Sequence, residues 1–164
     1  MREMVLLLTI CSNMLFAFNS NDLKKLKEEG DCPSCDLSGA DLRGIDLSMS
    51  DLNEANLTHA DLSDTLAHKA DFSHADLSYA TFTGANIKGA SFVQARLIHV
   101  DFSGARAWKS DFSHAKIDNC NFSESALGSA IFDENNVTNS RFDGAILYKT
   151  IFRKNVTGAP ERGR

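Results

Sequence analysis

Residues 36–62 read DLSGADLRGIDLSMSDLNEANLTHADL, with a large apolar residue at every fifth position. The same register runs from Leu37 to Phe152 through 24 positions without an insertion or deletion. Ten of these positions are Leu, nine Phe, two Ile and one Val, and Ala67 and Ala107 fill the other two. A period of five is neither the 3.6 of an α-helix nor the 2 of a half-buried strand. The pattern therefore predicts a repeat architecture whose short units stack to bury their apolar faces.

A second regular position lies two residues before each apolar one. Ala, Ser, Thr or Cys fill 21 of its 24 places, and the exceptions are Ile45, Val100 and Asn135. A narrow, close-packed interior can hold a large side chain only if its neighbour is small, so both positions should point inward. Asp or Asn often stands between them, as in Ala40-Asp41 before the next Leu.

This Ala-Asp-Leu unit with two further residues resembles the A(D/N)LXX pattern of the pentapeptide-repeat family. The match covers about 120 of the 164 residues. The resemblance implies an all-β fold, a right-handed quadrilateral parallel β-helix (a solenoid) with one pentapeptide on each side. The 24 units would then make about six coils across residues 36–154. Both prolines, Pro33 and Pro160, fall outside this region, as a continuous stack of strands requires.

The first twenty residues have a different character. An apolar run from Val5 to Phe18 ends at polar Asn19 and Ser20, which is typical of a secretory signal peptide and too short for a membrane span. We predict a signal peptide over residues 1–20, cleavage near Ala17 to Ser20, and a periplasmic or secreted mature chain without a stable membrane span. The alternative is an apolar extension that packs on the first coil.

Residues 21–35 are predicted to form a short capping helix and a CxxC segment. Asn21 or Asp22 can act as the N-cap, and Gly30 suits the C-terminal end. The helix would cover the open end of the first coil, whose edge and core would otherwise be exposed. A short helix followed by CxxC recurs in exported members of the family that the chain resembles. Residues 155–164 are predicted to be a flexible C-terminal tail.

The cysteines allow several interpretations. Cys35 occupies the small inward position, which favours packing at the cap with a disulfide to Cys32 after export. The alternatives are a zinc site, which needs four ligands, and a thioredoxin-like redox pair, which needs a βαβ context. Cys120 also occupies the small position and is predicted to be a buried small apolar residue.

Catalytic constellations can be located because residues 20 apart should stack. Two histidine pairs share a column but lie two coils apart, about 9–10 Å by strand spacing, too far to share a metal: His59 with His99, and His74 with His114. Two aspartate pairs should stack at about 4.8 Å: Asp41 with Asp61, and Asp51 with Asp71. These carboxylates belong to the repeat and lie on a convex surface, so local backbone hydrogen bonds are their predicted role. We predict no catalytic residue, no metal and no cofactor.

Charge differs between the four sides of the predicted rod. The sides around positions 42–142 and 52–152 each carry a net charge of −4 and are called the first and second acidic faces. The side around positions 47–147 carries +4 and is called the basic face, and the side around 37–137 is called the opposite face. Exposed aromatic and aliphatic residues between Lys and Arg are typical of a binding surface. The candidate protein-binding residues are Leu66, Lys69, Lys88, Arg106, Trp108, Lys109, Ile146, Tyr148 and Lys149. The alternative is that Leu66 and Trp108 only fold over the thin Ala67 and Ala107 rungs.

Two functional hypotheses follow. The first is a non-enzymatic, exported rod that acts as a rigid structural or protein-binding scaffold, as a monomer or a weak end-to-end dimer, with an unknown protein partner. The second is implied by the resemblance, since some family members mimic DNA and bind DNA gyrase. Two acidic faces fit that hypothesis, whereas the leader, the nearly balanced charge of residues 81–154 and a tail without a predicted helix weigh against it. A net charge of −5 disfavours nucleic acid as a partner.

Overall fold

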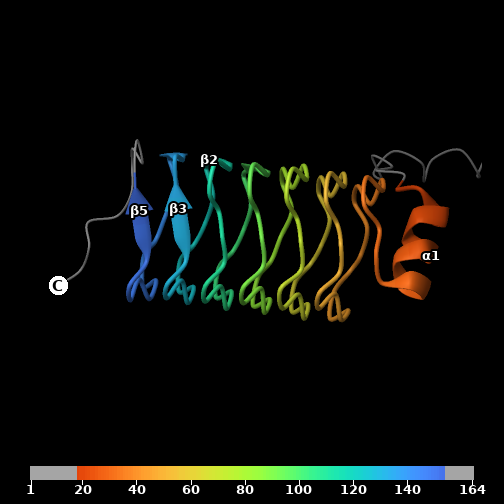
Figure 1. Cartoon of the computed structure of the whole chain (residues 1–164), viewed down its shortest axis with the longest axis horizontal. Helices are drawn as coiled ribbons and strands as arrows, with labels where there is room; N and C mark the ends of the chain where they lie inside the picture. The colour runs from red at the N-terminus through yellow and green to blue at the C-terminus, as the bar shows by residue number, and fades with distance from the viewer. Residues whose placement is uncertain (1–17, 154–164) are drawn as a thin grey trace, which may run out of the picture.

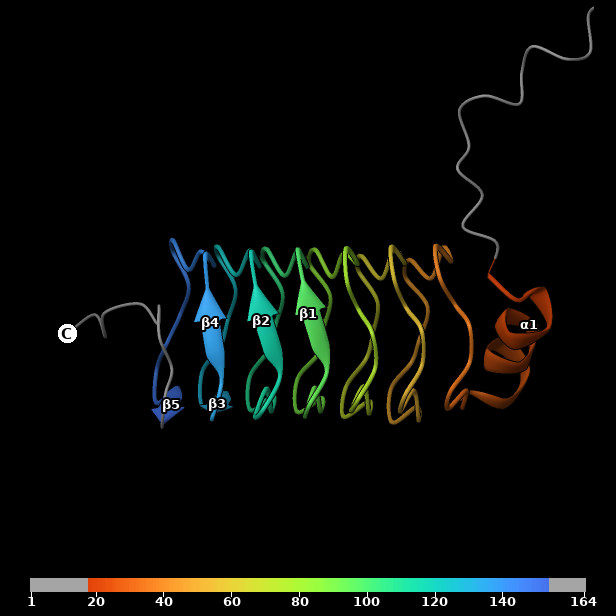
Figure 2. The same cartoon turned by 90° about the horizontal axis from the view of Figure 1, so that it is seen from above.

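The computed structural model describes residues 18–153, which form a straight stack of coils with one helix at its N-terminal end (Figures 1 and 2). Residues 20 apart pair in parallel along the stack, from Asp36 with Asn56 to Ala126 with Ile146. Each coil therefore contains four pentapeptides. The parallel β-helix implied by the family resemblance is confirmed.

Five of the coil sides are regular enough to form short strands. On the opposite face, β1 (Arg96–Ile98), β2 (Lys116–Asp118) and β4 (Asn136–Thr138) form a parallel sheet in that order, as Figure 2 shows. On the second acidic face, β3 (Ile131–Asp133) pairs with β5 (Ile151–Arg153). Each strand has three residues because one side of the coil is one pentapeptide long and a turn must follow.

The turns explain the other positions of the repeat. The residue two places after each apolar one has a positive φ, between 51° and 69°, at all 24 positions from Ser34 to Lys149, and 18 of these residues are not glycine. Such a conformation costs about 1–2 kcal/mol for a residue with a Cβ. Hydrogen bonds offset this cost: the amide of His59 donates to the carbonyl of Ser78 in the next coil at 2.9 Å, and the amide of Ala60 closes the turn at 3.1 Å.

The core is a double ladder of phenylalanine rings. Phe112 stacks between Phe92 and Phe132 with ring centroids 4.9 and 4.8 Å apart, and meets Phe102 and Phe122 edge-to-face at 5.7 Å. Both arrangements are favourable for aromatic rings and suit a close-packed interior. The parallel stacking also measures the coil spacing directly.

Several polar residues in the small inward position donate to backbone carbonyls, either in the preceding coil or, as Thr65 and Ser125 do, in their own coil. The side-chain amide of Asn135 donates to the carbonyls of Phe112 at 2.6 Å and Ala115 at 3.0 Å, and the hydroxyl of Ser110 donates to Ile87 at 2.7 Å. A buried polar group without a partner destabilises the rod. Asn135, an exception to the small-residue rule, is held by the backbone through its amide nitrogen, whereas its buried side-chain oxygen has no hydrogen-bond partner among the described residues.

At the N-terminal end of the rod, α1 (Ser20–Glu29) lies across the first coil (Figure 1). Its N-cap is Asn19, whose side chain accepts from the Asn21 amide, so the predicted cap at Asn21 or Asp22 is wrong. Asp22 instead accepts a hydrogen bond from the amide of Asp36 at 2.9 Å, which ties the helix to the rod. Leu26 is buried, and Phe18 and Leu23 pack against the same core. The predicted end of the helix at Gly30 is confirmed, with φ of 82°.

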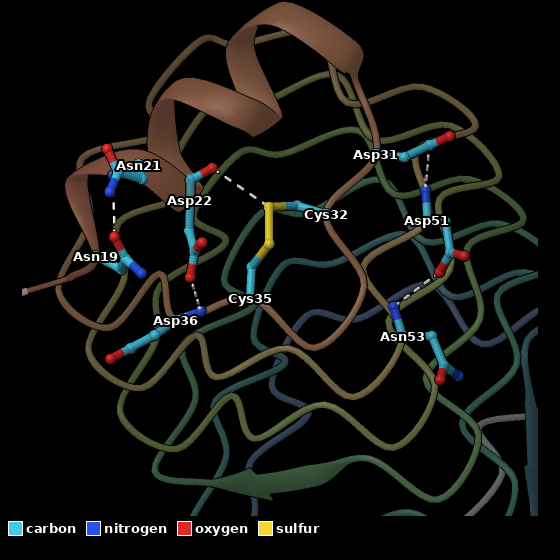
Figure 3. Close-up of a disulfide and its surroundings, with 9 residues drawn as sticks. All are labelled: Asn19, Asn21, Asp22, Asp31, Cys32, Cys35, Asp36, Asp51 and Asn53. Carbon is cyan, nitrogen blue, oxygen red and sulfur yellow. Dashed lines mark hydrogen bonds between the residues drawn. A yellow bond between two sulfur atoms is a disulfide. The ribbon is translucent and has the colours of Figure 1, made fainter.

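The CxxC segment forms a repeat unit of its own. Cys32 and Cys35 are joined by a disulfide (Figure 3), and Cys32 occupies the large inward position. Its amide donates to Asp51 in the next coil at 2.8 Å, and the Cys35 amide closes the usual turn. The repeat thus begins at Asp31, one unit earlier than the sequence prediction. The Cys32 sulfur lies 3.3 Å from the Asp22 carbonyl oxygen, a packing contact, since a disulfide sulfur carries no hydrogen.

The predicted signal peptide and its cleavage site fall largely, and the C-terminal tail wholly, outside residues 18–153. Within that range, the structure contains no helix long and apolar enough to cross a membrane.

Candidate protein-binding face

The basic face carries unpaired positive charge. Its outward positions between residues 66 and 149 hold no carboxylate, and each of its five cations is exposed. In the described part of the chain, none of these cations forms an ion pair, whereas arginines on other faces do. The five cations are Lys69, Lys88, Arg106, Lys109 and Lys149. These cations are therefore not engaged by ion pairs with described residues, although an acidic face flanks the basic face on each side.

The single carboxylate of the basic face lies toward the N-terminal end of the rod. Asp46 accepts a hydrogen bond from the Ser48 amide at 2.9 Å. Hydrogen bonds from the Ser48 side chain and backbone lower the pKa of Asp46, so it is ionised at neutral pH. The face is thus mildly acidic at its N-terminal end and basic along the rest of its length.

Trp108 leans onto the next coil. A Cβ on Gly128, 20 residues further along, would collide with the indole atoms Cε3, Cζ3 and Cη2. The ring therefore lies directly against the Gly128 backbone, and Trp108 is half-buried. The predicted alternative, in which Trp108 only folds over Ala107 in its own coil, does not include this contact with the next coil. The sequence signal is the glycine one coil later, which leaves room for the ring.

Besides Met49, which is 74% exposed at the N-terminal end of the face, three other apolar side chains of this face remain exposed. Leu66 is 48% exposed, Ile146 53% and Tyr148 61%. The Lys149 ammonium lies 5.1 Å from the centre of the Tyr148 ring, close enough for a cation–π interaction. Exposed apolar groups beside these cations form a surface that a partner could desolvate; Leu66 lies four coils from Ile146 and Tyr148, so the residues form a long strip rather than a cluster.

The histidine columns contain a stack that the sequence analysis missed. Tyr79 lies between His59 and His99, with ring centroids 4.8 and 5.0 Å apart and nearly parallel planes. The two histidines are thus bridged by an aromatic ring. In the other column, His114 lies 3.4 Å from Glu134. Within residues 18–153, no group of three or more His, Cys, Asp or Glu side chains is placed to hold a metal ion.

The carboxylates of the aspartate pairs accept hydrogen bonds from backbone amides. Asp61 and Asp71 accept from the amides two residues later, at 3.0 and 2.9 Å, as the local hydrogen-bonding prediction required. Asp41 also accepts from the side chain of Arg43, and these hydrogen bonds lower its pKa to about 2. A carboxyl group with that pKa stays ionised and cannot donate a proton as a general acid near neutral pH.

The sequence comparisons agree with this architecture. The model of pentapeptide repeats matches residues 35–73, 68–104, 95–133 and 110–148, in eight copies. The chain belongs to the pentapeptide repeat family. This membership gives the coil its right-handed sense, and proteins of the family are generally non-catalytic scaffolds. No curated protein matches the chain.

Solved structures of the family resemble the rod. A pentapeptide repeat protein (Rfr23) from the cyanobacterium Cyanothece 51142 has a TM-score of 0.56 and 16% identity, and the alignment covers 77% of this chain and 97% of that one. HetL of Nostoc, involved in heterocyst differentiation regulation, has 26% identity and a TM-score of 0.41 over 74% and 71% of the chains. A thylakoid-lumen protein of Arabidopsis thaliana has 30% identity and a TM-score of 0.41 over 76% and 70%. The first of these likenesses supports the shared fold.

Proposed function

We propose that this pentapeptide repeat protein is an exported, non-enzymatic scaffold that binds a partner protein through its basic face. The observation that carries the proposal is the stretch from residue 66 to 149, where five exposed cations lie without a carboxylate among them. Exposed apolar side chains on the same stretch, such as Leu66 and Tyr148, add area whose burial would favour binding. Charge would then steer the encounter, and apolar burial would hold the complex.

A rigid rod suits this role. The stacked phenylalanines and the hydrogen bonds between coils fix the relative positions of outward side chains along the whole length. Binding therefore costs little ordering of the rod itself, which favours affinity. We propose that α1 and the disulfide unit close the N-terminal end, so that the exposed core there does not associate with other chains.

Export is supported by the CxxC unit as well as the apolar leader. A disulfide persists in oxidising compartments and is rare in a reducing cytosol. The Cys32–Cys35 disulfide fills a core position, so it contributes packing as well as a cross-link. Cleavage after Ala17 would leave Phe18 to pack on the core and Asn19 to cap α1, as both do in the structure.

Position-specific photocrosslinking tests the binding face. A photoreactive phenylalanine analogue is placed at Lys88 or Lys109 on the basic face, or at His99 or Lys116 on the opposite face, in the native host. We expect a discrete crosslinked partner from the first pair and none from the second. Equal crosslinking from both faces, or none from the basic face, would refute the proposal.

Two variants then distinguish a role of Trp108 in binding from a role in covering the surface of the rod. Trp108→Ala and Lys109→Glu should both weaken partner capture, while Lys109→Glu leaves the melting temperature unchanged. If Trp108→Ala lowers the melting temperature and neither variant reduces capture, the indole only covers the rod. Recovery of the chain with Met1 intact from the cytosol would remove the export claim and favour the DNA-mimicking alternative.

A further inference from the structure

One column of the basic face, the left-handed turn position, repeats every second coil, while Lys88 lies on a coil between and Arg106 on the coil of Lys109. A lysine in the left-handed turn position occurs at Lys69, Lys109 and Lys149, and Gly89 and Ser129 occupy the same position in the coils between. Each lysine has an apolar residue on the same coil: Leu66, Trp108, and the Ile146–Tyr148 pair, respectively. Adjacent coils lie 4.8 to 5.1 Å apart, as the stacked phenylalanines show. The lysine-plus-apolar unit therefore recurs at about 10 Å.

From this period we infer that the partner presents an acidic amphipathic α-helix, lying along the long axis of the rod. Two turns of helix, seven residues, rise about 10.5 Å, so one carboxylate per heptad can face each lysine. From Lys69 to Lys149 the face spans about 20 Å, and carboxylates fourteen residues apart span about 21 Å. Flexible lysine side chains absorb the difference. The inference rests on the proposed function, because it names the chemistry of the partner at the same face.

Charge and apolar exposure both favour this occupant. The cations are not paired by described residues, so a carboxylate on the partner need not displace one of the chain's own. Between the second and third units, the coil with Ala126 and Gly128 has small outward residues, and the Trp108 indole lies on the Gly128 backbone. An apolar side chain one turn along the helix, about 5.4 Å away, can contact the indole there.

Other elongated partners fit less well. Side chains on one side of a β-strand repeat at about 6.6–6.8 Å, which falls out of register with a 10 Å period. A polyanion such as DNA would match the lysines through its phosphates but would leave Leu66, Ile146 and Tyr148 in water. A second copy of the rod could offer carboxylates from an acidic face, although Asp41 and Asp61 there lie against Arg43.

A synthetic peptide tests the inference on the chain carrying residues 18–164. The probe has three heptads with Glu and Leu at fixed heptad positions on one helix face, and the control is its isomer with the Glu residues moved to the opposite face. We expect the probe to bind, to gain helical circular dichroism, to change Trp108 fluorescence and to weaken as salt is raised. Lys69→Glu, Lys109→Glu and Lys149→Glu should each weaken binding about tenfold. The matched variant Lys116→Glu, on the opposite face, should bind like the wild type.

Several outcomes would overturn the inference. In the first, the isomer binds as tightly as the probe, which would show that the helix face does not matter. In the second, the three lysine variants, with melting temperatures like that of the wild type, bind the probe as the wild type does. In the third, the rod binds duplex DNA or phosphatidylserine vesicles more tightly than it binds the probe. Sedimentation that shows salt-sensitive self-association through the basic face would assign the face to a second copy. If the probe fails while the basic face still crosslinks specifically in cells, the helical partner is wrong and the proposed function stands. If that crosslinking also fails, the proposed function is wrong as well.

Discussion

Replacing Gly128 with Ala should force the Trp108 indole out of its place. The added Cβ would lie closer to three indole atoms than real Cβ atoms approach any neighbour. Gly128 lies outside the left-handed region, unlike most glycines of the chain, so alanine brings no backbone strain at this position. The collision with Trp108 is therefore the main effect of the substitution.

The size of the effect follows from this geometry. Overpacking of this kind costs about 1–3 kcal/mol, whether the ring is compressed or swings into water. In a Trp108→Ala background the collision is absent, and Gly128→Ala should be neutral or stabilise by up to about 1 kcal/mol through the unfolded state. The two substitutions should thus couple by about 1–3 kcal/mol. Gly44→Ala is a useful contrast, because its Cβ meets no atom within 4 Å but its φ is +64°. That substitution should cost the same with or without Trp108.

Two measurements check this reasoning. Urea unfolding followed by far-ultraviolet circular dichroism gives the four free energies of the Trp108 and Gly128 cycle. Trp108 is the only tryptophan in the chain, so its emission reports the ring directly and should shift to longer wavelength in Gly128→Ala. An equal cost of Gly128→Ala in both backgrounds, together with unshifted emission, would show that the indole does not lie on Gly128.

Three further predictions concern the core, the free thiol and the leader. Phe112→Ala should cost about 3–5 kcal/mol in unfolding experiments, because the ring is fully buried between four others, and Phe152→Ala at the end of the rod about 1–2 kcal/mol; equal costs would contradict the register. Burial raises the pKa of the Cys120 thiol to about 12, so a chain lacking residues 1–17 should resist a thiol reagent near pH 8 until it unfolds. Because the pKa of this thiol is higher in the folded than in the unfolded chain, its contribution to the free energy of unfolding falls as the pH rises above the thiol's pKa in the unfolded chain. Rapid labelling of the native chain would contradict the burial of Cys120. Mass spectrometry of the protein from its host should find an N-terminus near residues 18–21, whereas a chain that keeps Met1 would contradict processing.

The inward half of the structure could be predicted from sequence because one rule governs it. Every large position from Leu37 to Phe132 is buried, and Asp residues such as Asp61 bond the backbone as expected. The rule even extends to Asp31, Cys32 and Cys35, which fit the register one unit earlier. The prediction missed that unit because cysteine replaces leucine there, and the CxxC spacing suggested a separate motif.

The position of the helix cap was less predictable. Asn19, Asn21 and Asp22 are all good N-cap residues, so local preference cannot choose between them. The choice depends on the rod, since the Asn19 amide donates to the Asp36 carbonyl and the Asp22 carboxylate accepts from the Asp36 amide. A contact with a residue fourteen positions away decides which side chain is left to cap the helix.

Contacts between outward side chains follow a period of 20 residues, one coil, rather than the five-residue period of the core. Tyr79 stacks between His59 and His99 because the three residues are 20 apart, and Trp108 reaches Gly128 for the same reason. A pentapeptide pattern leaves these positions unconstrained, so each outward column can vary without disturbing the core. Selection for binding can therefore act on one column at a time, and a lysine that recurs every 40 residues beside an apolar residue is not required by the fold. That independence is why we propose the basic face, rather than the repeat itself, as the part of this protein that binds a partner.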